Sequence, residues 1–227
     1  MGERIISNDI LNTPIIIDHF NPRFYFHEQD CEKAKNANKK FLMTDIGKYS
    51  ITKPQHTIWI QKQLTQYFQK KNNDTRLLSI IDCNAGLGGD SIQFSKYFKS
   101  VLSIEKDEIH HFLLQNNCSV AESKNIEFRH DNFLNVIRNL QISCRYDLLF
   151  LDPPWGGPNY KHHEKITISI EDNETKKNIE DVLNDLYAYY KYVILKSPLN
   201  IHIQLSKIKY QNKIIKGDKL LLFIFEK

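Results

Sequence analysis

The sequence has few of the residues that cross-link a small protein. It contains four cysteines in 227 residues, and these lie far apart, with no Cys-x-x-Cys pair and no histidine at zinc-ligand spacing. A structural zinc site is therefore not expected, and we predict no bound metal. A chain of this length can bury roughly 70–75% of its unfolded surface, so it needs no such cross-link to fold.

Long apolar runs and an excess of one charge are missing as well. No apolar run approaches the roughly 18 residues that span a bilayer, and the first residues lack the apolar core of a secretory signal. We expect a monomer of the nucleus or cytoplasm, not secreted and without a membrane partner. The net charge is +4, which permits a phosphate-bearing ligand but falls short of the concentrated charge that binds long DNA.

Buried strands alternate with helices from about residue 77 onward. Apolar runs predict strands over 77–82, 101–105, 126–130, 147–151 and 192–195. Helices are predicted over 54–70, 90–98, 107–122, 132–140 and 176–190, and a terminal hairpin over 207–215 and 219–226. This alternation predicts a Rossmann-like α/β fold, with a mainly parallel sheet and an antiparallel edge at the C-terminal hairpin. Residues 1–53 are predicted to form a small helical N-terminal extension that contributes to the substrate site, and residues 54–227 the α/β domain.

A glycine-rich turn joins the first predicted strand to its helix. Residues 82–90, Asp-Cys-Asn-Ala-Gly-Leu-Gly-Gly-Asp, lack the third glycine of the dinucleotide-binding Gly-x-Gly-x-x-Gly pattern. Asp82 and Asp90 would oppose a pyrophosphate at the helix N-terminus, whereas a cofactor with a sulfonium and an amino group would favour them. The turn therefore favours S-adenosylmethionine over a nicotinamide dinucleotide.

Acidic residues follow the next two strands as well. Glu105 comes 23 residues after Asp82, where a carboxylate can accept both ribose hydroxyls, and Asp131 could accept from an adenine amine. A surface turn with acidic capping residues is the alternative, but acids at three successive strand ends favour the cofactor. The residues predicted to bind S-adenosylmethionine are Asp82, Asn84, Gly86, Gly88, Glu105, Lys106, Asp131, Asn132, Phe133 and Asp152.

The fourth predicted strand ends in residues 152–155, Asp-Pro-Pro-Trp. This is the form of the motif of methyltransferases that act on planar exocyclic amines. The Asp152 side chain and the Pro153 carbonyl can each accept one hydrogen of the amine, which turns the nitrogen lone pair toward the methyl donor. Trp155 can stack on the base. A Pro-Pro turn with Trp155 packed in the core is the alternative. Asp152, Pro153 and Trp155 are the predicted catalytic residues.

The motif is part of a longer match. Residues 152–160 resemble the Ser-Pro-Pro-Trp-Gly-Gly-Pro-x-Tyr signature of the trimethylguanosine synthases, which are RNA cap guanine-N2 methyltransferases. Residues 82–94 are similar to the family's Asp-x-x-x-Gly-x-Gly-Gly-x-x-Ile-Gln-Phe pattern. Residues 116–117 match its Asn-Asn pair, residues 130–134 its Gly-Asp-Phe-Leu segment with one insertion, and residues 48–54 its Trp-Phe-Ser-Val-Thr-Pro segment.

The resemblance implies a class I methyltransferase that uses S-adenosylmethionine to methylate the 2-amine of a 7-methylguanosine cap on RNA. The products would be 2,7-dimethyl- and 2,2,7-trimethylguanosine caps. It also implies that Trp155 stacks on the methylated guanine, that Asn117 contacts the cap phosphates, and that Ser50 and Thr52 line the site. The residues implied to bind substrate are Ser50, Thr52, Asn117, Trp155 and Lys196.

Two positions depart from the family pattern. Asp152 stands where the family has serine and resembles the adenine-amine enzymes, and Lys196 stands where the family has a phosphate-binding arginine. Methylation of a guanine 2-amine in ribosomal RNA, or of an adenine 6-amine in nucleic acid, is therefore an alternative. A cap-binding module without activity is another, because an aromatic ring on a cationic guanine binds by itself. The set of predicted cofactor residues argues against that module.

Overall fold

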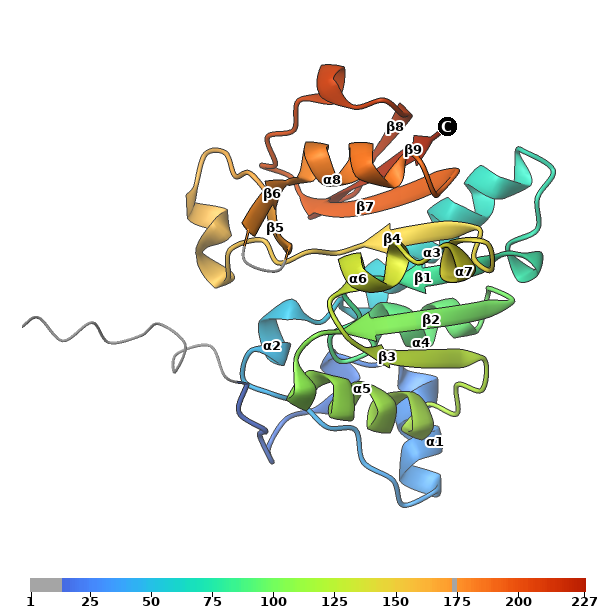
Figure 1. Cartoon of the computed structure of the whole chain (residues 1–227). Coiled ribbons are helices and arrows are strands. Elements are labelled where there is room, and N and C mark those ends of the chain that lie inside the picture. Colours follow the sequence, from blue (N-terminus) through green and yellow to red (C-terminus); the bar gives the residue numbers. More distant parts are fainter. Residues whose placement is uncertain (1–13, 173–174) are drawn as a thin grey trace, which may run out of the picture.

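The structure is a computed structural model that describes residues 14–172 and 175–227, with a seven-stranded sheet between two layers of helices (Figure 1). The strand order is β3-β2-β1-β4-β7-β9-β8. The bounds are β1 Ser79–Asp82, β2 Ser100–Glu105, β3 Ile126–His130, β4 Leu148–Leu151, β7 Tyr192–Pro198, β8 Gln211–Lys216 and β9 Leu220–Glu226. The first five strands in this order are parallel, and β9 is antiparallel to both neighbours. The predicted Rossmann-like α/β fold with its antiparallel C-terminal hairpin is confirmed.

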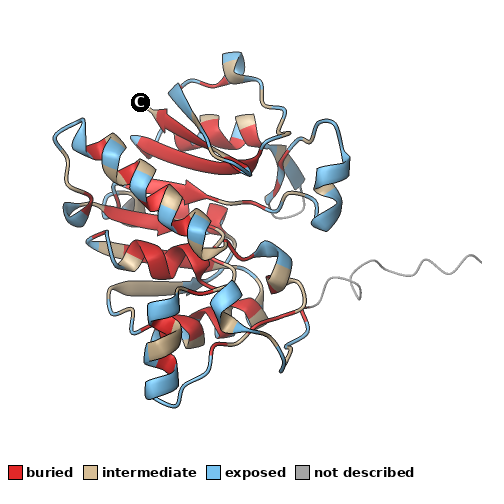
Figure 2. Ribbon diagram, turned by 180° about the vertical axis from the view of Figure 1, so that it is seen from behind, coloured by how far each residue is buried: buried red, intermediate tan, exposed pale blue. Residues whose placement is uncertain are grey.

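Helices cover both faces of the sheet. Their bounds are α1 Glu28–Asn36, α2 Gly47–Ser50, α3 Pro54–Gln69, α4 Gly89–Ser95, α5 Glu108–Val120, α6 Phe133–Ile137, α7 Leu140–Ser143 and α8 Ile179–Leu186. Ile60 and Leu64 of α3 and Phe94 of α4 belong to one core cluster, and Leu134 of α6 and Val182 of α8 to another. Figure 2 shows the central strands buried and the outward helix faces exposed. No helix among the described residues is long and apolar enough to cross a membrane.

The described part of the N-terminal extension, residues 14–53, packs on α5. Phe26 and Phe41 stack with ring centroids 4.0 Å apart, and they share a core cluster with Leu113 and Leu114 of α5. The extension is therefore attached to the α/β domain by apolar contacts beside the sheet edge formed by β3. Residues before position 14 lie outside the described part, and the division of the chain at residue 53 stays a prediction.

One hairpin differs from the sequence-based prediction. The chain forms β5 (Ser169–Asp172) and β6 (Thr175–Asn178), where the first turn of a helix over 176–190 was predicted. Helix α8 begins only at Ile179, after the hairpin. Ile170 of β5 is buried and anchors the hairpin on the core, whereas β6 has no buried residue, so its sequence carries no strand periodicity.

Strand β7 is longer than predicted. The apolar run ends at Leu195, but the strand continues through Lys196 to Pro198 because β9 pairs along its whole length. All seven residues of β7 are buried. Lys196 therefore lies within the sheet and not on a loop. The predicted helix 132–140 is also divided, into α6 and α7, with a break between Ile137 and Leu140.

Candidate active site

The carboxyl ends of the parallel strands bring the predicted site residues to one edge of the sheet. Asp82 ends β1, Glu105 ends β2, Asp131 follows β3, Asp152 follows β4, and Lys196 lies in β7. The five strands are parallel and adjacent, so their carboxyl ends share this edge (Figure 1). The strand order reverses between β1 and β4, which is where open α/β sheets bind their ligands.

Asp82 is a buried carboxylate, 1% exposed. Its Oδ2 accepts a hydrogen bond of 2.6 Å from the Ser91 hydroxyl, which is itself 2.7 Å from the Ser103 hydroxyl. Burial, with the nearby Asp90 carboxylate, raises the pKa of Asp82 to about 8. A further cationic partner at this carboxyl would lower its pKa again.

The glycine-rich turn leaves backbone accessible beside Asp82. Gly86 and Gly88 have positive φ angles of 52° and 92°, which residues with a Cβ rarely adopt. A Cβ built on Gly86 would meet nothing within 4 Å. The side-chain oxygen of Asn84, two residues before Gly86, is buried and accepts no hydrogen bond from the described residues. The turn thus presents open space and an unused acceptor.

Glu105 is held in place by two backbone N–H groups. Gly86 N donates to its Oε2 and Asp107 N to its Oε1, each at 2.8 Å. The side chain is half-buried at the end of β2. Each carboxylate oxygen keeps a lone pair for a second donor. This geometry is suited to a ligand that carries a pair of hydroxyls.

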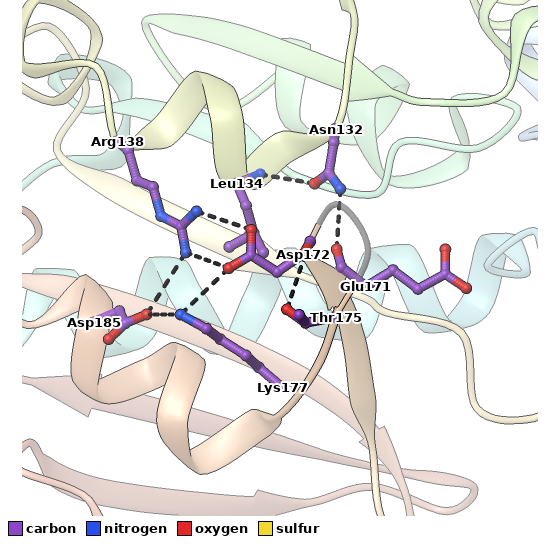
Figure 3. Close-up of polar contacts among 8 residues, drawn as sticks. All are labelled: Asn132, Leu134, Arg138, Glu171, Asp172, Thr175, Lys177 and Asp185. Carbon is purple, nitrogen blue, oxygen red and sulfur yellow. Dashed lines mark hydrogen bonds and ion pairs between the residues drawn. The ribbon is translucent and has the colours of Figure 1, made fainter.

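The residues predicted to lie around the adenine differ in their exposure and in their hydrogen-bond partners. Asp131 is exposed, and its Oδ1 accepts from Asn132 N at 2.6 Å. Asn132 caps α6 by accepting from Leu134 N, while its amide donates to the backbone oxygen of Glu171 at 3.0 Å (Figure 3). The Lys106 ammonium lies 2.6 Å from the Glu171 carboxylate. The β5–β6 hairpin, which the sequence did not predict, therefore borders this part of the site. Phe133 is buried in the core cluster of α6 and α8.

An ion-pair network fixes that hairpin (Figure 3). Arg138, at the C-cap of α6, donates two bonds of 2.9 Å to the Asp172 carboxylate, and Lys177 lies 3.3 Å from the same group and 2.8 Å from Asp185. The hydrogen bonds from Arg138 hold the pKa of Asp172 at about 2. Because the network ties α6, the hairpin and α8 together, it sets where Glu171 meets Asn132 and Lys106.

Asp152 faces a buried lysine. Its Oδ2 is 2.5 Å from Lys196 Nζ, which is also 2.5 Å from Thr52 Oγ1. Thr52 donates to Asp90 Oδ2 at 2.5 Å. Burial raises the pKa of Asp152 to about 6, against the opposing effect of the Lys196 ammonium. Thr52 thus connects the N-terminal extension to the end of β4.

Trp155 is half-buried beside this group. Its ring meets the edge of Tyr160 at 5.2 Å between centroids, and Lys196 Nζ is 5.3 Å from its centroid. The indole Nε1 is buried and donates to none of the described residues. Pro153 is buried and Pro154 exposed. Trp155 packs only partly against the core, so part of its ring is left for a ligand.

Two predicted substrate residues are placed differently from the expectation. Asn117 is fully buried: its amide donates to the backbone oxygens of Leu42 and Leu87, and its oxygen accepts from Leu42 N. Lys196 is 4% exposed and faces Asp152. Both side chains are buried and paired within the chain, which disfavours the expected phosphate contacts, and their substrate roles stay predictions. Ser50 is exposed at the end of α2, and its substrate role stays a prediction.

Asn117→Ala is expected to act on stability and not on substrate binding. Removing the amide leaves the N–H and C=O of the partly buried Leu42 and the buried C=O of Leu87 without this partner, which should lower the free energy of unfolding by about 3 kcal/mol and Tm by about 6–12 °C. Asn116→Ala, next along α5 and partly exposed, is the matched control and should cost about 1 kcal/mol or less. If Asn117→Ala has a normal Tm but a raised KM for the acceptor, the result would support the predicted contact between Asn117 and the cap phosphates.

The comparisons with known proteins identify the family. Residues 77–219 match the model of the RNA cap guanine-N2 methyltransferases, which is more than half of the chain. The chain belongs to this family. At the level of the family, the predicted methyltransferase class and the predicted cofactor, S-adenosylmethionine, are confirmed.

The chain is also similar to individual curated proteins. The uncharacterized protein L320 of Acanthamoeba polyphaga mimivirus is 34% identical over 57% of this chain and 50% of its own length. The trimethylguanosine synthase of Schizosaccharomyces pombe is 34% identical over 49% of this chain and 45% of its own length. The chain spans about half the length of these relatives. The fold resembles the 16S rRNA N2 G1207 methyltransferase of Thermus thermophilus, with a TM-score of 0.55, 14% identity, and 75% of this chain and 42% of that chain covered.

The residues at the sheet edge fit the family's cofactor. Asp82 Oδ1 and Asn84 Oδ1 are buried and accept no hydrogen bond from the described residues, so each can accept from a donor of the ligand. S-adenosylmethionine carries an amino group that suits Asp82 and ribose hydroxyls that suit Glu105. The open space at Gly86 lets the ligand approach the backbone. The individual contacts stay predictions.

Proposed function

We propose that this chain transfers methyl groups from S-adenosylmethionine to the exocyclic 2-amine of a 7-methylguanosine cap on RNA. The observation that carries the proposal is the arrangement at the end of β4. Asp152, the proline pair and a half-buried Trp155 follow this strand directly, at the same edge as Asp82 and Glu105. Capped RNA as partner, a nuclear or cytoplasmic setting, and 2,7-dimethyl and 2,2,7-trimethyl products belong to the same proposal.

The chain's own residues would act mainly by positioning. Oδ1 of Asp152 makes no hydrogen bond within the described residues, so it can accept one hydrogen of the amine, while the Pro153 carbonyl accepts the other. When bound, S-adenosylmethionine supplies the methyl group on its sulfonium. The positive charge of a 7-methylated purine acidifies its 2-amine, so the carboxylate of Asp152 suffices to take the released proton.

A 7-methylated cap analogue is expected to be methylated more readily than GTP. Trp155 should attract a cationic purine by about 0.5–2 kcal/mol more than a neutral one, which corresponds to a roughly 2- to 30-fold difference in kcat/KM. The measurement is transfer of labelled methyl groups to the cap analogue, GTP, ribosomal RNA and adenine substrates.

The same assay separates the alternatives. Methylation of a neutral guanine in structured RNA is the second candidate, because Asp152 stands where the family has serine and a carboxylate needs no cationic base to accept the proton. Equal turnover of methylated and unmethylated guanine would favour it. Cap binding without turnover, and without binding of S-adenosylmethionine by calorimetry, would favour a cap-binding module.

A further inference from the structure

A buried cluster of charges joins β4 and β7 at the active edge of the sheet. The two strands pair in parallel with Leu151 opposite Leu195, so the next residues along them are Asp152 and Lys196. Lys196 is 4% exposed, and its ammonium lies 2.5 Å from Asp152 Oδ2 and 3.7 Å from Asp90 Oδ2. One cation therefore meets two carboxylates where water is nearly excluded.

We propose that Lys196 is a positioning residue that keeps Asp152 ionised and fixes its Oδ2, leaving Oδ1 to the acceptor amine. The inference rests on the proposed function for the identity of that amine, but the pairing itself does not depend on it. Thr52 completes the arrangement, since its hydroxyl accepts from Lys196 and donates to Asp90. The N-terminal extension thereby fixes the same ammonium.

The cost of burial supports this role over a phosphate contact. An isolated ammonium or carboxylate is expensive to remove from water, and a close ion pair with further hydrogen bonds offsets that cost. The two departures from the family pattern also compensate each other. Asp152 places a negative charge where the family has a neutral serine, and Lys196 places a positive charge directly against it.

The surrounding charges set the ionisation of the pair. Burial alone would lower the pKa of the Lys196 ammonium, but the carboxylates of Asp152 and Asp90 outweigh it, so that pKa is above its ordinary value. For Asp152, burial and Asp90 raise the pKa while Lys196 lowers it. The other titratable groups that act on this pair come from β1, α3 and the loop after β4: Asp82, His56 and Tyr160.

The pH profile of kcat is the decisive measurement. In the wild type, kcat should fall below about pH 6, because protonated Asp152 cannot accept the hydrogen. K196M removes the cation, which should move this acidic limb upward by roughly 1–3 pH units. The loss would then be about tenfold at pH 7 and small at pH 9. KM for the acceptor and Kd for S-adenosylmethionine should change less than about twofold.

Two further variants separate charge from packing. K196R keeps the charge and should keep the acidic limb near its wild-type position, even where its size lowers kcat. K216M removes an exposed lysine of β8 and should leave the profile unchanged. A K196M enzyme whose kcat is lowered equally at every pH would overturn the proposal, because lost packing acts at all pH values.

A stability cycle tests the pair without any activity. Tm is measured for the wild type, D152S, K196M and D152S/K196M. If the pair is coupled, K196M lowers Tm more in the wild type than in the D152S background, where one buried carboxylate fewer is left unpaired. If K196M lowers Tm equally in the two backgrounds, the proposal is overturned. If K196M does not fold, the proposal is overturned when D152S/K196M does not fold either. A wild type that methylates another acceptor refutes only the cap, since the pH profile is then measured with that acceptor and the stability cycle needs none.

Discussion

Asp152→Ala is expected to lower turnover by about 10²-fold or more at pH 8, while binding of the cap analogue changes little. The carboxylate orients the amine and accepts its proton, and the loss of one such group typically costs this much. Trp155 and the backbone of the Pro-Pro turn are unchanged by the substitution, so the purine keeps its stacking surface. Single-turnover rates and the cap-analogue Kd measure the two effects separately.

The exposed Asp181 in the first turn of α8 offers the control, since Asp181→Ala removes a carboxylate from a different element and should leave turnover unchanged. An Asp152→Ala enzyme with normal turnover would mean that the side chain serves only as the partner of Lys196. Orientation and proton transfer would then depend on the Pro153 carbonyl and solvent. Retained cap binding with lost turnover would instead place Asp152 at the reacting nitrogen.

The structure also changes what is expected of the family's own residue at this position. With serine in place of Asp152, Lys196 would keep only Asp90 and Thr52 as partners. Serine alone therefore restores the family residue at position 152 but leaves the buried ammonium of Lys196 without its closest carboxylate. We expect D152S to be less active and less stable than the resemblance by itself suggests. The family pattern has an arginine at position 196, whereas here the serine would face the buried Lys196.

The strands and their acidic ends could be predicted from the sequence for a physical reason. Parallel strands are buried on both faces, so they are short apolar runs, and a polar residue at the end of each run marks where the strand ends. Asp82, Glu105 and Asp131 follow this pattern, and the structure places them at one edge. Their ligand contacts are not part of the pattern and stay predictions.

What the sequence did not show depends on tertiary contacts. Lys196 extends an apolar strand, and lysine is almost never buried unless paired, so the predicted strand ends at Leu195, three residues before the end of β7 at Pro198. The partner, Asp152, is 44 residues away in the chain. Asn117 had a usable signal: it follows Leu113 and Leu114 by four and three residues, the spacing of one buried helix face. For β6, Thr-Lys-Lys-Asn offers neither apolar residues nor alternation.

Glu105→Ala is expected to raise the Kd for S-adenosylmethionine by about 10²-fold. A carboxylate that accepts from the ribose hydroxyls makes charge-assisted bonds worth roughly 1.5–3 kcal/mol each, and 1.4 kcal/mol is a tenfold change in Kd. Gly86 N and Asp107 N hold both oxygens in place before any ligand binds, so little ordering cost is left at binding. Glu105→Gln keeps one acceptor oxygen and the side-chain size, and should lie between the alanine variant and the wild type.

Calorimetry measures this effect, and Tm without ligand tests for damage to the turn. Glu108→Ala is the matched control: it removes an exposed carboxylate three residues along the chain, in the first turn of α5, and should leave Kd within about twofold. Cofactor affinity that is unchanged in Glu105→Ala, together with a lowered Tm, would make Glu105 a residue that only ties the glycine-rich turn to β2. The ribose would then have to bind elsewhere along the sheet edge, and the assignment of the cofactor to the ends of β1 and β2 would be wrong.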